Sequence, residues 1–465
     1  MSSQPARPVP RDLDVTGGVA SICEARRFVD LDDEVVDRSK RVVLDTVGCI
    51  LLGSTLPAGR AAQSYVDSFS AGAESTVIGT SRRAPAPFAA LANGTAAHAD
   101  ELDGVHRVSA HPAAIAVGGC LPMAESVGAS GEELINAICL AFDVGCGLVT
   151  SFGGGASLRR APRHLHAAPM IALGVAAAGA RMLRLDASTI RRALALASVN
   201  ALVAEAFLDE PTHMAKSLAQ GQSAFAGVTG VRLASHGFAA NERIIDAPDG
   251  LADTWWNEDA DLTTVLDNIT GRAHVLDNGF KYYSAGYAVQ APISASLALL
   301  DEHDIHPDSI SALRVGMTSN SAGKVDGNRI SSISLQDMLS VAIVRGKLGY
   351  EEAHDPANTN DADVLALRQK IEIVRDPEKD ARQPRSRSAW VEIEVHGGRV
   401  HRAPDQLPAG HWELGGMPWV DVHRKFGVLA AHAGVDTPRI THIARTVEAL
   451  EDLNDVSALI EALTG

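Results

Sequence analysis

The sequence predicts a mainly α fold, made of a large all-helical domain and a smaller α+β lid domain. Apolar residues recur at helical spacing through most of residues 1–276, and strand-like alternation begins only after about residue 277. Alanine and glycine are abundant, whereas aromatic residues make up only 4% of the 465 residues. Small side chains of this kind suit closely packed helices.

The helices expected in the large domain follow one another with short breaks. After an arm over residues 1–14, the pattern predicts helices at 20–25, 33–53, 57–73, 87–103, 112–127, 131–152, 171–183, 188–202 and from 212 to 236. The segment from Trp419 to Leu463 is helical again. The chain is therefore expected to return to its first domain, with domain limits at 1–276, 277–412 and 413–465.

The smaller domain is expected to mix strands and helices. Strands are predicted at 313–318, 371–374 and 390–395, and helices at 288–302, 335–345 and 362–370. The last strand alternates strictly and runs into His396-Gly397-Gly398, which is typical of a hairpin turn.

Composition excludes several classes of function. The net charge of −16 and the lack of basic, aromatic-rich runs argue against a nucleic-acid partner. No run of 18 apolar residues predicts a membrane span, and residues 1–13 lack the apolar core of a secretory signal. The five cysteines are odd in number and form no C-x-x-C pair, so we expect reduced core residues in a cytoplasmic protein and no zinc site.

Residues 93–112 form the most polar stretch within the apolar helices. They contain three histidines, several acids and Arg107. A helix over 87–103 would place His98 and Glu101 on one face, and Pro112 would start the next helix with His111 beside its anion-attracting N-terminus. The pattern indicates an acid/base and anion-binding centre; the alternative is a solvated helix–loop–helix with ordinary capping residues.

Three further features are candidates for chemistry. Residues 157–169 carry arginines and two histidines, and form either a solvated basic loop or an anion-binding segment. Lys216 enters an apolar helix, where a lysine either extends to solvent or serves a site. Residues 279–287 form a turn-rich aromatic stretch around Lys281.

Taken together, five stretches make the chain resemble the MmgE/PrpD family. They are Asn93-Gly94 with His98, Glu101, Asp103, His106 and His111-Pro112; His166-Ala167 before an Ala-rich helix; Lys216 with Gly221 and Gly227; Lys281 with Tyr283; and Ser334-Leu335. The resemblance implies the two-domain architecture above, a homodimer, and a small-molecule carboxylate substrate. It also implies that neither a metal nor an organic cofactor takes part.

The resemblance also implies roles for individual residues. His111 would be the acid/base, His166 its partner, and Lys216 and Lys281 the carboxylate-binding cations; His164 is the alternative to His166. Glu101 and Asp103 would orient the histidines, unless they only cap a helix or pair with Arg107. Substrate contacts are expected from His98, His106, Tyr283 and Tyr287, although His98 and His106 also fit structural, hydrogen-bonded histidines.

The chain departs from the family pattern at several positions. Gly104 and Val105 replace polar residues, while Ser284-Ala285-Gly286-Tyr287 and Gln290 stand where the lid loop commonly has an arginine and a histidine. With fewer cations, the site is expected to take a substrate with fewer carboxylates than methylcitrate. The predicted reaction is loss of water from a hydroxy acid by histidine acid/base chemistry; the alternatives are an epimerase, isomerase or decarboxylase using the same residues, or a catalytically altered scaffold.

Overall fold

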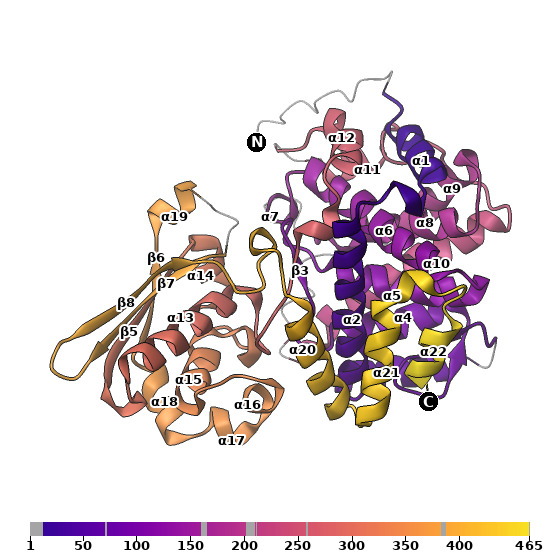
Figure 1. Ribbon diagram of the computed structural model, residues 1–465. Coiled ribbons are helices and arrows are strands. Elements are labelled where there is room, and N and C mark those ends of the chain that lie inside the picture. The colour runs from indigo at the N-terminus through magenta and orange to yellow at the C-terminus, as the bar shows by residue number, and fades with distance from the viewer. Residues whose placement is uncertain are drawn as a thin grey trace. The chain divides into compact units, whose positions relative to one another are not determined.

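The computed structural model describes residues 13–69, 72–159, 165–200, 210, 212–256, 259–382 and 387–464 (Figure 1). It divides into two compact units. The first comprises Met1–Ala99, Asp103–Asn278 and Pro418–Gly465, and the second comprises Asp100–Leu102 and Gly279–Met417. The chain thus enters the second unit twice, and the first entry is only a three-residue segment.

The first unit is almost entirely helical, as the sequence predicts. Its helices are α1 (Val15–Ala25), α2 (Asp33–Ser54), α3 (Pro57–Asp67), α4 (Ala86–Ala97), α5 (Pro112–Val127), α6 (Gly131–Ser151), α7 (Gly155–Leu158), α8 (Ala168–Met182), α9 (Ala187–Ser198), α10 (Met214–Ser235), α11 (Leu251–Trp255), α12 (Val265–Thr270), α20 (Trp419–His432), α21 (Thr437–Glu448) and α22 (Ser457–Thr464). Short strands are β1 (Ser75–Thr76), β2 (Arg83–Ala84) and β3 (Val105–His106), and β4 (Asn278–Gly279) lies where the chain leaves this unit.

Small residues let the central helices approach closely. A Cβ atom on Gly221 of α10 would lie 2.1 Å from Thr95 Oγ1 and 2.3 Å from the Leu91 carbonyl oxygen of α4. Glycine at this position therefore permits a contact between backbones that no other residue allows. The contact fixes the start of α10 against the end of α4, where several of the candidate site residues lie.

One helix of the first unit, α6, is long and apolar enough to cross a membrane by length and composition. However, 94% of its most apolar window is buried inside the structure, as in the core helix of a globular unit. Ser130 and Glu133 form a reciprocal capping box at its start. All five cysteines are buried thiols outside any disulfide, in line with the expectation of core residues.

The C-terminal helices α20, α21 and α22 return to the first unit (Figure 1). Phe426 of α20 packs against Gly48 of α2, and Lys425 Nζ lies 2.6 Å from Asp45 Oδ1 in a buried ion pair. Residues more than 370 positions apart in the chain therefore share one core.

The second unit contains a four-stranded sheet in the order β6-β5-β7-β8. Its strands are β5 (Ile310–Met317), β6 (Ile371–Arg375), β7 (Ala389–Val395) and β8 (Val400–Gln406), and its helices are α13 (Tyr287–His303), α14 (Ser319–Val325), α15 (Leu335–Arg345), α16 (Tyr350–His354), α17 (Pro356–Thr359), α18 (Ala362–Arg368) and α19 (Pro377–Arg382). β5 pairs in parallel with β6 and antiparallel with β7. β7 and β8 form the expected hairpin, in which Gly397 and Gly398 supply the positive φ values of the turn.

The prediction of one helix over 87–103 is wrong. α4 ends at Ala97, and residues 99–103 form turns, so His98 and Glu101 do not share a helix face. Asp100 Oδ1 accepts a hydrogen bond from the backbone N–H of Glu101 at 2.8 Å, and such a local side-chain bond competes with helix formation. α3 is also shorter than predicted, ending at Asp67, and the expected end of α9 near residue 202 lies outside the described residues.

Candidate active site

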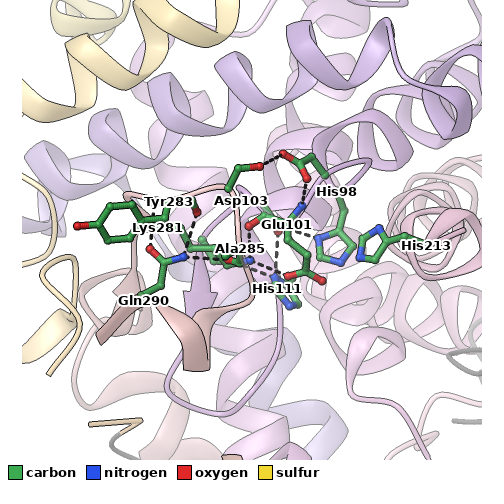
Figure 2. Close-up of polar contacts among 12 residues, drawn as sticks. His98, Glu101, Asp103, His111, His213, Lys281, Tyr283, Ala285 and Gln290 are labelled. Carbon is green, nitrogen blue, oxygen red and sulfur yellow. Dashed lines mark hydrogen bonds and ion pairs between the residues drawn. The ribbon is translucent and has the colours of Figure 1, made fainter. Parts of the chain in front are cut away.

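A buried carboxylate lies between two histidines in the first unit (Figure 2). Asp103 Oδ1 lies 2.7 Å from His98 Nδ1, and Asp103 Oδ2 lies 3.1 Å from His111 Nδ1. His111 Nδ1 is also 3.1 Å from the carbonyl oxygen of Gly104. Since carboxylate and carbonyl oxygens only accept, both imidazoles must donate from Nδ1, which leaves Nε2 as the basic nitrogen of each neutral ring.

The electrostatics of this cluster keep the carboxylate charged. Burial raises the pKa of Asp103, but the two imidazoles more than offset it and hold that pKa well below its ordinary value. The pKa of His98 is lowered to about 3, mainly by burial; Asp103 opposes this shift, and the charges of His111 and Lys216 add to it. His98 is therefore a neutral imidazole at physiological pH.

The two rings differ in access to solvent. The side chain of His98 is 0% exposed and that of His111 is 13% exposed, and their ring centroids lie 4.3 Å apart. Among the residues that the structure describes, no group hydrogen-bonds to His98 Nε2. His111 is thus the more exposed ring of the pair.

The start of α10 completes this cluster. The His213 ring lies 5.1 Å from the His98 ring, and Ser217 Oγ donates to the backbone oxygen of His98 at 2.8 Å. The charge of Lys216 lowers the pKa of both His98 and His166. Lys216 is half-buried, which supports a role in the site over full extension into solvent.

His166 precedes α8 and is also buried. Its Nδ1 accepts from the N–H of Ala168 at 3.2 Å, so the hydrogen of the neutral ring resides on Nε2. Burial lowers the pKa of His166 well below its ordinary value, and the charges of Arg159, His111, Lys216 and His98 lower it further. His166 is therefore a neutral N–H donor, whereas His111 offers a lone pair; His164, the alternative to His166, lies outside the described residues.

Arg159 is a cation that the sequence analysis did not assign to the site. Its guanidinium donates to the carbonyl oxygen of Ser109 at 3.0 Å, and it has the largest effect on the pKa of His166 after burial. This position favours the anion-binding interpretation of residues 157–169. Ser109 holds a positive φ of 62°, so the loop before His111 is locally strained where Arg159 supports it.

In the second unit, Lys281 and Glu101 form a buried ion pair (Figure 2). Lys281 Nζ lies 2.9 Å from Glu101 Oε2 and also donates to the Glu101 backbone oxygen at 2.9 Å. Lys281 is fully buried and Glu101 nearly so. Because an isolated buried charge is very costly, the two residues depend on each other.

The neighbouring acid, Asp100, joins a second cluster of the same unit. Its oxygens accept from Ser284 Oγ at 2.7 Å and lie 2.9 Å from His354 Nε2. Burial raises the pKa of Asp100, but His354 and Ser284 bring it below its ordinary value; burial lowers the pKa of His354, and Asp100 brings it above its ordinary value. No sequence motif marks His354, so its place in this cluster could not be predicted.

The loop after Lys281 is organised by Gln290 of α13 (Figure 2). Gln290 Oε1 accepts from the N–H groups of Tyr282 and Tyr283 at 3.0 Å, and its Nε2 donates to the oxygens of Tyr283 and Ala285 at 3.0 and 2.9 Å. Both donors of its NH₂ group and both lone pairs of its oxygen are thus used on the loop backbone. Gln290 therefore has a structural role, because it holds the loop backbone in place.

The two tyrosines proposed as substrate contacts lie in different surroundings. Tyr283 accepts a hydrogen bond from Ser294 Oγ at 3.3 Å and is partly buried against the core of the second unit. Tyr287 is buried and stacks parallel to Trp412 at 6.2 Å. Their contact with a substrate stays a prediction.

Among the described residues of the first unit, two groups have the residue types of a metal site. They are His98 with Asp103 and His111, and His106 with Cys146 and His274. In the first group the Nδ1 atoms already donate to Asp103. In the second, His106 Nε2 lies 2.9 Å from the His274 oxygen and its Nδ1 accepts from Val108 N–H. These bonds support the structural alternative for His106, and its contact with a substrate stays a prediction.

The chain is similar to known proteins over most of its length. Residues 18–262 match the MmgE/PrpD N-terminal domain and residues 283–449 match the MmgE/PrpD C-terminal domain. The chain is 26% identical to human cis-aconitate decarboxylase over 97% of this chain and 95% of the human protein. It is 25% identical to the mouse protein of the same name over 97% of this chain and 93% of that protein.

A cis-aconitate decarboxylase-like protein of Aspergillus oryzae is 27% identical over 47% of this chain and 46% of its own length. The two domain matches together span most of the chain, and the mammalian relatives span nearly all of it. These matches support an enzyme of the lyase type. The chain belongs to the MmgE/PrpD family.

Proposed function

We propose that this enzyme removes water from a small hydroxy carboxylic acid, with His111 as the acid/base. The observation that carries the proposal is Asp103, a buried ionised carboxylate that accepts from Nδ1 of both His98 and His111. A carboxylate in this position fixes the tautomer of a histidine and stabilises its imidazolium form. His111 is the partly exposed ring of the pair.

The proton transfers balance on one imidazole. His111 Nε2 takes the proton from the carbon next to the substrate carboxylate, and the electron pair of that bond forms the new double bond as the hydroxyl leaves. The imidazolium then passes its proton to the leaving hydroxyl, which departs as water. His166, with its hydrogen on Nε2, donates a hydrogen bond to the oxygen that gains charge.

Cations near the histidines support a carboxylate substrate. Lys216 and Arg159 are both cations whose charge lowers the pKa of His166. Each suits a carboxylate, Arg159 by paired donors and Lys216 as a compact charge. Lys281 is neutralised by Glu101, which supports a substrate with fewer carboxylates than methylcitrate.

Decarboxylation is the second candidate reaction. The relatives that cover nearly the whole chain are named cis-aconitate decarboxylases. The same residues would serve it, because loss of CO₂ leaves a carbanion that needs a proton from His111 imidazolium. Epimerisation needs the same proton transfer without loss of a group.

The test is a substrate panel with two readouts. Ultraviolet absorbance near the enoate band follows dehydration of 2- and 3-hydroxy acids, and CO₂ release follows decarboxylation of unsaturated polycarboxylates. His111→Asn retains a donor toward Asp103 but removes the base, while His236→Ala changes an exposed histidine at the end of α10. Turnover that survives His111→Asn would contradict the assigned role of His111.

We extend the proposal to assembly and cofactors, following the family resemblance. The enzyme is expected to act as a homodimer without a metal or organic cofactor. Sedimentation of the purified protein and activity after exhaustive chelation test these two points.

A further inference from the structure

Gln220 is a buried polar side chain with no hydrogen-bond partner in the described part of the chain. It lies in α10, and the residue is 0% exposed. Neither its Oε1 nor its Nε2 atom has a hydrogen-bond partner among the residues that the structure describes. An unsatisfied buried amide costs about 1–3 kcal/mol for each lost group, so a protein rarely keeps one without a reason.

The helix periodicity places Gln220 on the face of α10 that carries other site residues. It follows Lys216 by four residues and His213 by seven, which is one and two helical turns. Lys216 is the cation whose charge acts on His98 and His166.

Packing against α8 gives the position of Gln220 along this face. A Cβ on Gly227 of α10 would touch Ala172 and Val175 of α8, and Gly179 of α8 lies against Val231. The two helices therefore run parallel at this contact. Seven residues before Gly227, about 10.5 Å along the axis, Gln220 comes level with the start of α8, where His166 lies.

A second unpartnered group belongs to the same region. His98 Nε2 is fully buried and has no hydrogen-bond partner among the described residues. Ser217, three residues before Gln220, donates to the backbone of His98. Two buried groups with unused hydrogen-bonding capacity thus occur around one set of reacting histidines, as expected where a ligand supplies the missing partners.

We propose that Gln220 is a specificity residue that hydrogen-bonds an uncharged hydroxyl group of the substrate. A carboxamide both donates and accepts, so it matches a hydroxyl but does not neutralise a carboxylate. The inference rests on the proposed function and deepens it, because it assigns a neutral polar group to the substrate beside the carboxylate held by Lys216.

Matched ligand pairs test this role. Calorimetry would compare malate with succinate, and citramalate with methylsuccinate, since each pair differs by one hydroxyl. For the unmodified enzyme we expect the hydroxylated member to bind at least about tenfold more tightly, because a site built for a hydroxyl rejects its deoxy analogue. In Gln220→Met the ratio is expected to fall to within about twofold, with succinate binding unchanged.

A control variant and a stability measurement separate this role from a structural one. Gln222→Met makes the same change two residues away on α10 and should leave the ratio unchanged. Gln220→Met should keep or raise the thermal midpoint, because it removes an unsatisfied amide; Gln220→Leu serves if the methionine variant does not fold. An unchanged binding ratio in both folded variants overturns the inference.

The outcome also distinguishes the inference from the proposed function. If the unmodified enzyme binds no member of either pair, the proposed carboxylate site is contradicted, and the role of Gln220 falls with it. If both members of each pair bind equally, the carboxylate site stands and only the role of Gln220 is overturned.

Discussion

Replacement of Asp103 by asparagine tests how the histidine cluster works. The asparagine retains the size of the side chain but has one acceptor and one donor in place of two acceptors. Its oxygen can accept from Nδ1 of only one histidine, and its NH₂ group must face Nδ1 of the other. One of the two rings is then forced to carry its hydrogen on Nε2.

The size of the loss in turnover depends on which of the two histidines changes its tautomer. His98 donates over 2.7 Å, whereas His111 has the Gly104 oxygen as a second acceptor at 3.1 Å, so competition between the rings decides the tautomer of the base. In the Ser-His-Asp triad of serine proteases, an Asp→Asn change that leaves the histidine in the wrong tautomer lowers turnover about 10⁴-fold. That factor equals about 5 kcal/mol at 1.36 kcal/mol for each tenfold change. The Gly104 oxygen still accepts from His111 Nδ1 and so keeps part of the His111 rings in the correct tautomer. We therefore expect turnover to fall about 10³-fold in Asp103→Asn.

The assay is kcat on the substrate identified from the panel, with folding followed by circular dichroism. Asp143→Asn is the matched control, because Asp143 is also a buried carboxylate of the first unit, paired with Arg26 at 2.8 Å. The control should lose stability but retain kcat per folded molecule. A folded Asp103→Asn enzyme with less than a tenfold loss would refute the tautomer argument.

Three further variants probe the second unit. Lys281→Met leaves the Glu101 carboxylate buried without its partner and should lower the free energy of unfolding in urea by about 3–5 kcal/mol. His354→Gln removes the pairing with Asp100 that raises the pKa of His354. This pairing stabilises the folded enzyme fully below the ordinary histidine pKa, and the stabilisation is lost as pH rises through the raised pKa of His354. Since His354 is 36% exposed, the difference in unfolding free energy should stay below about 1 kcal/mol. Gln290→Leu removes four hydrogen bonds to the loop, worth about 4 kcal/mol in all at about 1 kcal/mol each, and should speed hydrogen exchange of the loop amides.

Each of these variants has a contrasting outcome. Adding Glu101→Gln to Lys281→Met should recover part of the lost stability, and a further loss would contradict the buried-pair argument. The stability difference between the unmodified enzyme and His354→Gln should be larger at pH 6 than at pH 9, and the reverse order would contradict the sign. Unchanged loop exchange in Gln290→Leu would show that other contacts hold the loop.

Much of the fold is encoded locally and could be predicted. α5 and α15 have the predicted bounds because Pro112 and Ser334 mark their starts in the sequence. The hairpin of β7 and β8 follows from strict alternation and two glycines. In such segments the nearest neighbours in the chain supply the decisive interactions.

The site was harder to predict where partners are distant in the chain. Asp100 and His354 are 254 residues apart, and no spacing rule connects them. The sequence predicts that residues 98–103 continue a helix, yet Asp100–Leu102 belongs to the second unit. Gln220 has no sequence signal either, because a glutamine within a helix is ordinary until its burial is known.

The discontinuous first unit has a consequence for synthesis. α20 packs on α2, and the backbone N–H of Gly131 donates to the oxygen of Leu453, so the unit needs its last segment to close. Gly279–Met417 must leave the ribosome first, which takes roughly ten to thirty seconds at about 5–20 residues per second. During that interval the part of α2 that α20 covers has no partner helix. A nascent chain paused after residue 417 should therefore bind chaperones and be cleaved within α2 by proteases, whereas the released chain should resist cleavage there.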